Sequence, residues 1–470
     1  MSGMKQPVLK RGLPGSRTLA LVVAALATLP VHAAELGRIE GFGPISRAMA
    51  GAGVAHPHGA AAMMLNPAEL LRLDSPQEWL VQITGIHARI EVFNRDTGER
   101  VQSANNNDNR GPYYLPEVAF AARRGRWAFG AGVFGAGGFG IEFGNESFLS
   151  RTSTFGVQTG LPVNTRVQLL RIPFSLAWQA HPQWRLGASL DVVNASVNIA
   201  SLLDVQQVGM LIANGRASGS LVPVLAGVPD LAGAHLDFVR NNVVSSRLNG
   251  WGLGGRLGLS HTPAPGTDLA LAYEFETRLD DLQGRGRLTA VDKDNRHIVL
   301  AGEGRLPQFQ FPQAFVLGVS QRLTPALTGL VDLRRTFWRD TLGDTLVTFR
   351  ADGGGDLRVS LPTQFNNLTT LTLGLQWQAS PTLTARLGGS HAFQNTVAAD
   401  SLNGSFPTLT RNHLTAGLTW RYRAAHELGA TLSYGFTGTV ENAGGNSNSI
   451  PAIGGDNRQI NPAMSYVYRF

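Results

Sequence analysis

The chain has 470 residues, a formal net charge of +7, no cysteine and 56 glycines. A chain of this length without disulfides must be held together by its backbone architecture. Four of the seven net charges belong to the first 33 residues, so the rest of the chain is only weakly basic, and the charge gives no reason to expect nucleic acid as a partner.

The first 33 residues have the pattern of a secretory signal peptide. Four basic residues and no acidic residue precede or flank an apolar run over 19–29, which is followed by Val31-His32-Ala33. This run is too short to cross a bilayer as a helix, which needs about 20 apolar residues. We therefore expect residues 1–33 to be a cleaved signal peptide, and any membrane-spanning part of the mature chain to consist of strands.

Alternating apolar and polar residues predict β-strands along most of the mature chain. The apolar faces carry Trp, Tyr or Phe near the strand ends, as in the C-terminal set Met464, Tyr466, Tyr468 and Phe470. The polar faces consist of Thr, Ser, Gly, Gln and Arg. Outer-membrane barrels place apolar side chains toward lipid, aromatic girdles at the interfaces and small polar groups in the lumen. This register predicts Leu432 on the lipid face and Ser433 in the lumen.

About fourteen such segments can be delimited, which predicts an all-β fold, a 14-stranded antiparallel transmembrane β-barrel over residues 76–470. The segments cover 78–93, 113–123, 126–142, 163–181, 183–199, 245–262, 266–285, 308–323, 325–339, 366–380, 382–394, 410–423, 427–441 and 459–470. Short turns alternate with long polar connections at 94–112, 143–162, 200–244, 286–307, 340–365, 395–409 and 442–458. Short periplasmic turns and long external loops are typical of transmembrane barrels.

Two regions break the alternation. Residues 34–75 precede the first strand and are predicted to form a hatch inside the lumen. Within the longest connection, helical spacing places Leu202, Val205, Val208 and Ile212 on one face, and Asn214-Gly215 is a suitable stop. This face either packs within the loop or forms an apolar landing site for a ligand.

The pre-barrel segment carries a family resemblance. It reads Gly41-Phe42-Gly43, then 46–55 as a Gly/Ala-rich stretch, then Asn66-Pro67-Ala68. This resembles the hatch of the FadL/TodX family of outer-membrane transporters, in which an Asn-Pro-Ala motif precedes the barrel. The stretch 248–254 is similar to the Gly/Trp-rich opening of a mid-barrel strand in the family, and Phe311-Pro312-Gln313 resembles a place where the family often has Pro followed by a strand. The resemblance implies passive uptake of hydrophobic small molecules, with Phe42 and Ile45 lining the pocket, no cofactor and no metal.

The resemblance also implies that ligand leaves sideways through a kink in the third strand. Gly135, Gly137, Gly138 and Gly140 cluster there, and glycine within a strand marks bulges or bends. Tight packing of the hatch against the wall is an equally good explanation of these glycines.

The ligand's identity stays open at this point. The family's fatty-acid transporters use a basic residue on the fifth strand, whereas the latter half of this strand in the present chain offers Asp191, Asn194 and Asn198. A neutral hydrocarbon or aromatic compound therefore remains an alternative to a fatty acid. Lumen-facing Arg171 and Arg256 could meet a polar head group, although pairing of Arg256 with Glu274 or Glu276 is the simpler expectation. His56 and His58 could bind metal or respond to pH, but a solvated loop is the simpler interpretation.

Other functions have weaker support. Three G-x-G-x-x-G matches fall in strands, so dinucleotide binding fails its structural context, and neither a phosphate-binding P-loop nor a G-x-S-x-G nucleophile elbow occurs. We do not expect an enzyme. A general polar porin and an outer-membrane lipolytic enzyme are the alternatives to a transporter. The expected partners are the hydrophobic ligand, outer-membrane lipid and lipopolysaccharide, with the barrel acting as a monomer.

Overall fold

The computed structural model describes residues 39–103, 113–242, 245–405 and 410–470. The predicted signal peptide lies outside the described residues, as do parts of the connections 94–112, 200–244 and 395–409. No helix in the described part of the chain is long and apolar enough to cross a membrane.

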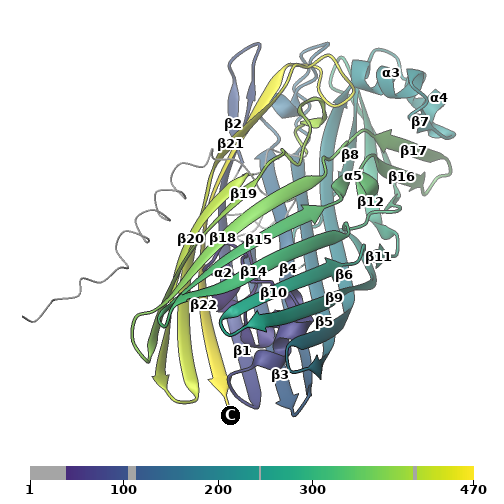
Figure 1. The fold of residues 1–470 in the computed structure, drawn as a ribbon. Coiled ribbons are helices and arrows are strands. Elements are labelled where there is room, and N and C mark those ends of the chain that lie inside the picture. Colours follow the sequence, from purple (N-terminus) through teal and green to yellow (C-terminus); the bar gives the residue numbers. More distant parts are fainter. Residues whose placement is uncertain (1–38, 104–112, 243–244, 406–409) are drawn as a thin grey trace, which may run out of the picture. The chain divides into compact units, whose positions relative to one another are not determined.

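Within the described residues, fourteen antiparallel strands pair in a closed ring (Figure 1). In order around the ring they are β1 (Gln77–Asn94), β3 (Tyr113–Arg124), β4 (Trp127–Gly144), β5 (Val163–His181), β6 (Trp184–Asp204), β9 (Leu248–Ala264), β10 (Thr267–Glu274), β14 (Ala314–Thr324), β15 (Leu327–Thr336), β18 (Leu368–Gln378), β19 (Leu383–Ala392), β20 (Asn412–Arg423), β21 (His426–Asn442) and β22 (Ile453–Arg469). The ring closes where β22 pairs with β1. The predicted strand number is confirmed.

The remaining strands lie at the end with the long connections. They are β2 (Arg100–Gln102), β7 (Ala217–Ser218), β8 (Leu231–Phe238), β11 (Arg278–Leu279), β12 (Leu282–Asp292), β13 (His297–Leu306), β16 (Thr345–Ala351) and β17 (Asp356–Leu361). Because β8 and β12 also bridge β6 to β9, a second route around the described sheet passes through sixteen strands. The short helices of this end are η3 (Phe148–Ser150), α3 (Val205–Ala213), α4 (Leu221–Ala226), α5 (Trp338–Thr341) and η4 (Ala399–Ser401).

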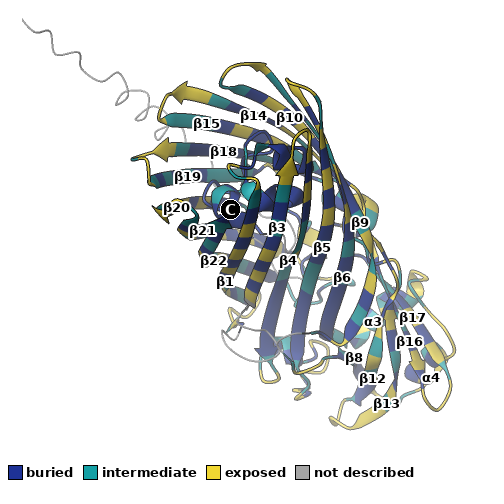
Figure 2. Cartoon of the chain, turned by 90° about the horizontal axis from the view of Figure 1, so that it is seen from below, coloured by how far each residue is buried: buried dark blue, intermediate teal, exposed yellow. Residues whose placement is uncertain are grey.

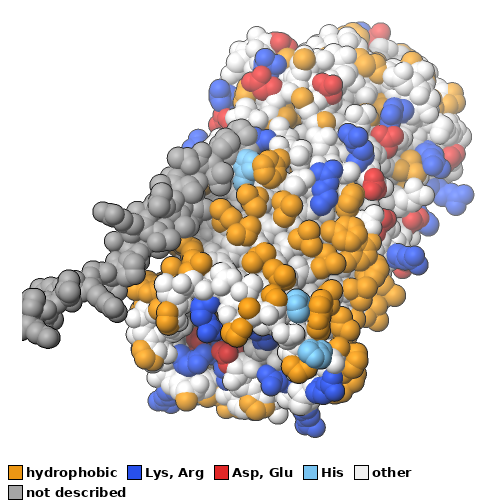
Figure 3. Space-filling view, viewed as in Figure 1, with side chains coloured by type: hydrophobic (Ala, Val, Ile, Leu, Met, Phe, Trp, Pro, Cys, Tyr) orange, Lys and Arg blue, Asp and Glu red, His pale blue; other side chains and the backbone are white. Residues whose placement is uncertain are grey.

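The burial pattern matches the predicted register. Leu432 is 53% exposed whereas Ser433 is fully buried, and buried and exposed residues alternate along the ring strands (Figure 2). Hydrophobic side chains form a band across the outer face, with charged side chains toward both ends (Figure 3). Trp127 stacks on Trp178, and Trp184 on His261, beside the short turns. Such a surface suits a lipid environment with aromatic interfaces.

Several predicted boundaries are wrong. The segment 266–285 is not one strand, because β10 ends at Glu274 and Thr277 instead bonds to the connection before β14, at Phe311. The long polar connections predicted at 200–244, 286–307 and 340–365 hold further strands that were not predicted from the sequence: β7, β8, β12, β13, β16 and β17. The last strand begins at Ile453, which lies within the connection predicted at 442–458.

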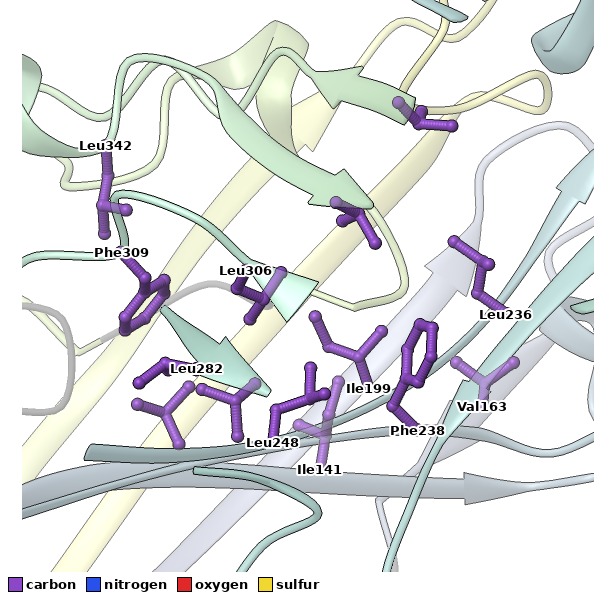
Figure 4. Packing of buried hydrophobic residues seen from close by; sticks show 14 of the residues in the cluster. Ile141, Val163, Ile199, Leu236, Phe238, Leu248, Leu282, Leu306, Phe309 and Leu342 are labelled. Atoms are coloured by element: carbon purple, nitrogen blue, oxygen red, sulfur yellow. The ribbon is translucent and has the colours of Figure 1, made fainter. Parts of the chain in front are cut away.

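These hairpins fold because their inward faces are apolar. Phe238, Leu282 and Leu306 belong to one buried cluster that continues down to Ile141, Val163, Ile199 and Leu248 on the ring strands (Figure 4). Each alternating run is short and flanked by charged residues, so it contains few hydrophobic residues. The buried cluster is recognised only in the folded structure, where the apolar faces of several strands pack together.

Candidate functional site

The segment before β1 lies within the ring and against every one of its fourteen strands. It contains α2 (Gly43–Arg47), η1 (Gly59–Met64) and η2 (Pro67–Arg72). Its helices pack on nine of the strands: β1, β3, β4, β5, β6, β9, β20, β21 and β22. Its side chains and backbone form hydrogen bonds with β10, β14, β15 and β18. Met49 lies close to Gly388 of the remaining strand, β19. We call residues 39–74 the inner segment.

The Asn66-Pro67-Ala68 motif has a clear structural role. The Asn66 amide donates to Val54 O at 2.8 Å and to Ser260 Oγ of β9 at 2.9 Å, while Asn66 Oδ1 accepts from Ala68 N. Asn66 thus caps η2 and ties the inner segment to itself and to the wall. A side chain at Gly258 would clash with Asn66 Oδ1, so the wall residue at this point has to be glycine.

A cavity of about 890 Å³, partly open to solvent, lies between the inner segment and the wall. One side comes from the inner segment and is mostly apolar, with Ile39, Ala50, Val54, Met64 and Leu65 beside Glu40. The opposite side comes from β9, β10, β15, β18, β19 and β20 and includes Arg256, Glu274, Asp332, Arg334, Thr370, Thr372, Ser390 and His413. This cavity is hereafter the central cavity.

Beside the central cavity the wall carries a buried ion network. Arg256 bonds to Asp191 at 2.7 Å and to Glu274 at 3.1 Å, and Arg171 bonds to the same two carboxylates, both at 3.0 Å. Arg334 contacts Glu274 at 2.8 Å. Both arginines singled out from the sequence are therefore paired within the wall. Glu276, the other candidate partner, is exposed and forms no ion pair with described residues.

Asp332 fixes the turn of the inner segment that lines the central cavity. Its Oδ2 accepts the backbone amides of Gly53 at 2.7 Å and Val54 at 2.9 Å. Nearby, His58 Nε2 donates to Gly53 O at 2.7 Å, and Gly53 itself has a φ of 126°, in the region that favours glycine. Asp332 was not singled out from the sequence, although its place on the polar face of a predicted strand put it in the lumen.

His56 and His58 are buried rather than solvated, and their rings lie 5.7 Å apart. Burial lowers the pKa of His58 to about 4, and burial together with the neighbouring His58, Arg72 and Arg386 holds the pKa of His56 well below its usual value. Both rings are therefore neutral at pH 7. The interpretation of this stretch as a solvated loop is wrong, because the inner segment carries it into the lumen. Among the described residues no group of three His, Cys, Asp or Glu side chains could hold a metal ion.

The third ring strand, β4, is irregular at the predicted glycines. Its pairing with β5 shifts register between Gly135 and Gly137, and Gly138 has a φ of 154°. Its pairing with β3 ends at Phe134, opposite Glu117. Beyond that point β3 continues to pair with β1 only, and Pro116 has no amide hydrogen to offer β4. Past Phe134 along β4, toward Gly135, no backbone pairing among the described residues joins β4 to β3. We call this break in the hydrogen-bonded wall the wall interruption.

The two candidate residues of the inner segment lie beside the central cavity but not among the residues that line it. Phe42 is buried and packs edge-on against Phe134. Ile45 packs against a small cluster of Met49, Ala52 and Leu330. The lining is instead formed by the neighbouring residues Ile39, Gly41 and Ala50.

A second cavity, of about 990 Å³, lies at the end with the long connections; we call it the loop cavity. Leu202 lines it, but from β6 rather than from a helix, because α3 begins only at Val205, capped by Asp204. The helix ends at Asn214-Gly215 as predicted. The sequence placed Val205, Val208 and Ile212 on one face; all three are half-buried, and the fully buried positions are Gln207 and Leu211.

Comparisons with known proteins agree with this architecture. The chain matches the family described as outer membrane protein transport protein (OMPP1/FadL/TodX) over residues 26–468. No curated protein matches it. The crystal structure of the toluene transporter TodX of P. putida is similar, with 31% identity, a TM-score of 0.82, and coverage of 92% of this chain and 99% of that one.

Two further solved structures are similar. The toluene transporter TbuX of Ralstonia pickettii shares 35% identity at a TM-score of 0.77, with 92% of this chain and 99% of that chain covered. A Pseudomonas aeruginosa FadL homologue shares 16% identity at a TM-score of 0.71, over 93% of this chain and all of that one, and supports the fold alone.

Proposed function

Because the chain belongs to the OMPP1/FadL/TodX family of outer membrane transport proteins, we propose that it is a passive uptake channel for neutral hydrophobic compounds, monoaromatic hydrocarbons above all. The central cavity carries this proposal. It joins an apolar surface to a wall whose arginines are already paired. A fatty-acid carboxylate would compete there with Asp191 and Glu274, which already bond to Arg171, Arg256 and Arg334, and it would lie on the same cavity as Glu40.

The loop cavity is the proposed landing site. Leu202 lines it together with Phe148, Leu236 and Ile450, which offers apolar contact at the outer end of the barrel. α3 contributes Gln207 to its lining, and Val205, Val208 and Ile212 of the same helix are half-buried. Ligand would then pass inward, with Phe42 and Ile45 supporting the inner segment beside the central cavity rather than lining it.

The interruption between β3 and β4 is the proposed exit. The register shift at Gly135 and Gly137 and the conformation of Gly138 fall in the part of β4 that has no backbone pairing with the described part of β3, and Gly140 follows in the same part. A hydrophobic compound leaving there would enter the bilayer without crossing the periplasmic end of the barrel, where the Asn66-Pro67-Ala68 capping motif holds the inner segment in place.

The remaining assignments follow from this scheme. We propose a signal peptide over 1–33, a hatch over 34–75 and a transmembrane barrel over 76–470. A monomer is sufficient because both cavities are built from one chain. Outer-membrane lipid and lipopolysaccharide would surround the hydrophobic band. We assign no catalytic role and no cofactor.

Uptake by cells tests the proposal. A strain lacking this chain, and the same strain with the chain restored, should be compared for initial uptake of radiolabelled toluene and radiolabelled oleate. We expect restoration to increase toluene uptake and to leave oleate uptake nearly unchanged. Restoration of neither compound would contradict a hydrophobic channel, and restoration of oleate alone would contradict the preference for neutral compounds.

A further inference from the structure

Three hydroxyl groups form a polar strip on the wall of the central cavity. Thr370 and Thr372 stand two residues apart on β18, and both line the cavity. Ser390 of β19 also lines the cavity and lies directly across from Thr372. The three side chains therefore share one face and one patch of wall.

These hydroxyls have no hydrogen-bond partner among the described residues. Thr370 Oγ1 is closed off from solvent without a partner, and Thr372 is only 7% exposed. Some buried lumen hydroxyls are paired, as when Thr419 Oγ1 accepts from Arg386 at 3.0 Å, and others, such as Ser433 Oγ, have no partner among the described residues but do not line this cavity. Thr372 and Ser390 line the cavity with no side-chain hydrogen-bond partner among the described residues, so their hydroxyls are available to a water molecule or a ligand group.

The surroundings of the strip define which group fits. The facing surface, with Ile39, Val54 and Met64, accepts an apolar body. Arg256 and Arg334 on the same cavity already bond to carboxylates of the wall, and Glu40 adds a further carboxylate. A hydroxyl group is neutral and can both donate to and accept from Thr and Ser, so it satisfies the strip without disturbing the ion network.

We propose that the central cavity is a binding site for hydrophobic compounds that carry one hydroxyl, such as simple phenols and alcohols, in preference to the corresponding hydrocarbons. The hydroxyl bonds to Thr372 and Ser390, and the apolar body lies against the inner segment. The inference rests on the proposed function and narrows its substrate class. Sites built to bond a hydroxyl discriminate against analogues that lack it, because their own polar groups are then left unpaired.

Equilibrium dialysis of the purified full-length protein tests this, with radiolabelled p-cresol and radiolabelled toluene as probes. We expect the wild type to bind p-cresol more tightly than toluene. In Thr372→Val and Ser390→Ala, which remove the hydroxyl with little change in volume, the ratio of p-cresol affinity to toluene affinity should fall about tenfold for the loss of a buried hydrogen bond. Thr431→Val is the matched control, because Thr431 is a buried lumen residue of β21 that does not line the cavity.

The outcomes separate the two proposals. Wild-type binding of toluene that equals or exceeds binding of p-cresol would overturn the hydroxyl preference and leave the channel standing. An unchanged ratio in both variants would do the same, and would assign the strip to water. Failure of the wild type to bind either compound would overturn the proposed function together with this inference.

Discussion

The ring of Phe42 lies edge-on to the ring of Phe134, with the centroids 5.9 Å apart and the planes at 89°. Phe134 is the last residue of β4 that pairs with β3, and Phe42 directly follows the cavity-lining residue Gly41. The contact therefore joins the inner segment to the border of the wall interruption. Both rings are buried, so their packing stabilises this arrangement.

Replacement of Phe42 by alanine should loosen the inner segment. We expect Phe42→Ala to lower the free energy of unfolding by about 3 kcal/mol, as for large-to-small changes in a packed core. Urea unfolding of the protein in lipid vesicles measures this. Phe155→Ala is the control, since Phe155 is 48% exposed in an outer connection and its loss should cost less than about 0.5 kcal/mol. Equal effects of the two substitutions would contradict a packing role for Phe42.

A side chain at Gly138 should remove the irregularity of β4 or block its pairing with β5. A Cβ at this glycine would clash with the carbonyl oxygen of Val167, and its φ of 154° disfavours other residues. We expect Gly138→Val to reduce toluene uptake at least several-fold while the protein still reaches the outer membrane. Gly209→Ala, at a helix position with open space around it, should leave uptake unchanged. Normal uptake by Gly138→Val would remove β4 from the proposed exit route.

The barrel could be predicted from the sequence because the alternation that marks a strand involves only neighbouring residues. Leu432 and Ser433 fall on opposite faces from alternation alone, and the irregular stretch of β4 lies at glycines that were visible in the sequence. The hairpins β12–β13 and β16–β17 were missed because buried residues such as Phe349 and Val359 occur in short runs among charged neighbours.

The central cavity could not be predicted, since it depends on contacts between distant parts of the chain. Asp332 bonds to Gly53, 279 positions earlier, and the polar strip at Thr372 faces the inner segment. Neither of these contacts produces a recognisable pattern among neighbouring residues of the sequence. Arg171 and Arg256 were visible as lumen residues, but whether they were paired depended on Asp191 and Glu274 from other strands.

Removal of one member of the ion network should cost more than removal of an ion pair at the surface. Arg256→Met removes two buried charge-assisted hydrogen bonds, to Asp191 and Glu274, although Arg171 still contacts both carboxylates. We expect a loss of about 3 kcal/mol in unfolding free energy, measured in vesicles. Arg285→Met should have little effect, because its pairing with Asp352 is exposed. A loss for Arg256→Met no larger than for Arg285→Met would contradict a structural role for the network.

The buried histidines should make the protein less stable in acid. Burial lowers the pKa of His58 to about 4, against about 6.5 in the unfolded chain. Below pH 6.5 the unfolded state therefore takes up a proton that the folded state does not, and stability falls as the pH drops from about 6.5 to about 4. The depressed pKa of His56, caused first by burial and then by His58, acts in the same direction.

Urea unfolding in vesicles at pH 7 and pH 4.5 measures this dependence. His58→Gln removes a titrating group but keeps a side chain that can donate toward Gly53 O, so its stability should decline less with falling pH than that of the wild type. The difference between the two declines should be about 2–3 kcal/mol, the linkage expected for a shift of this size. His297→Gln, at an exposed position of β13, should decline as the wild type does. If His58→Gln and the wild type lost stability in parallel, His58 would not be the group that ties the inner segment's stability to pH.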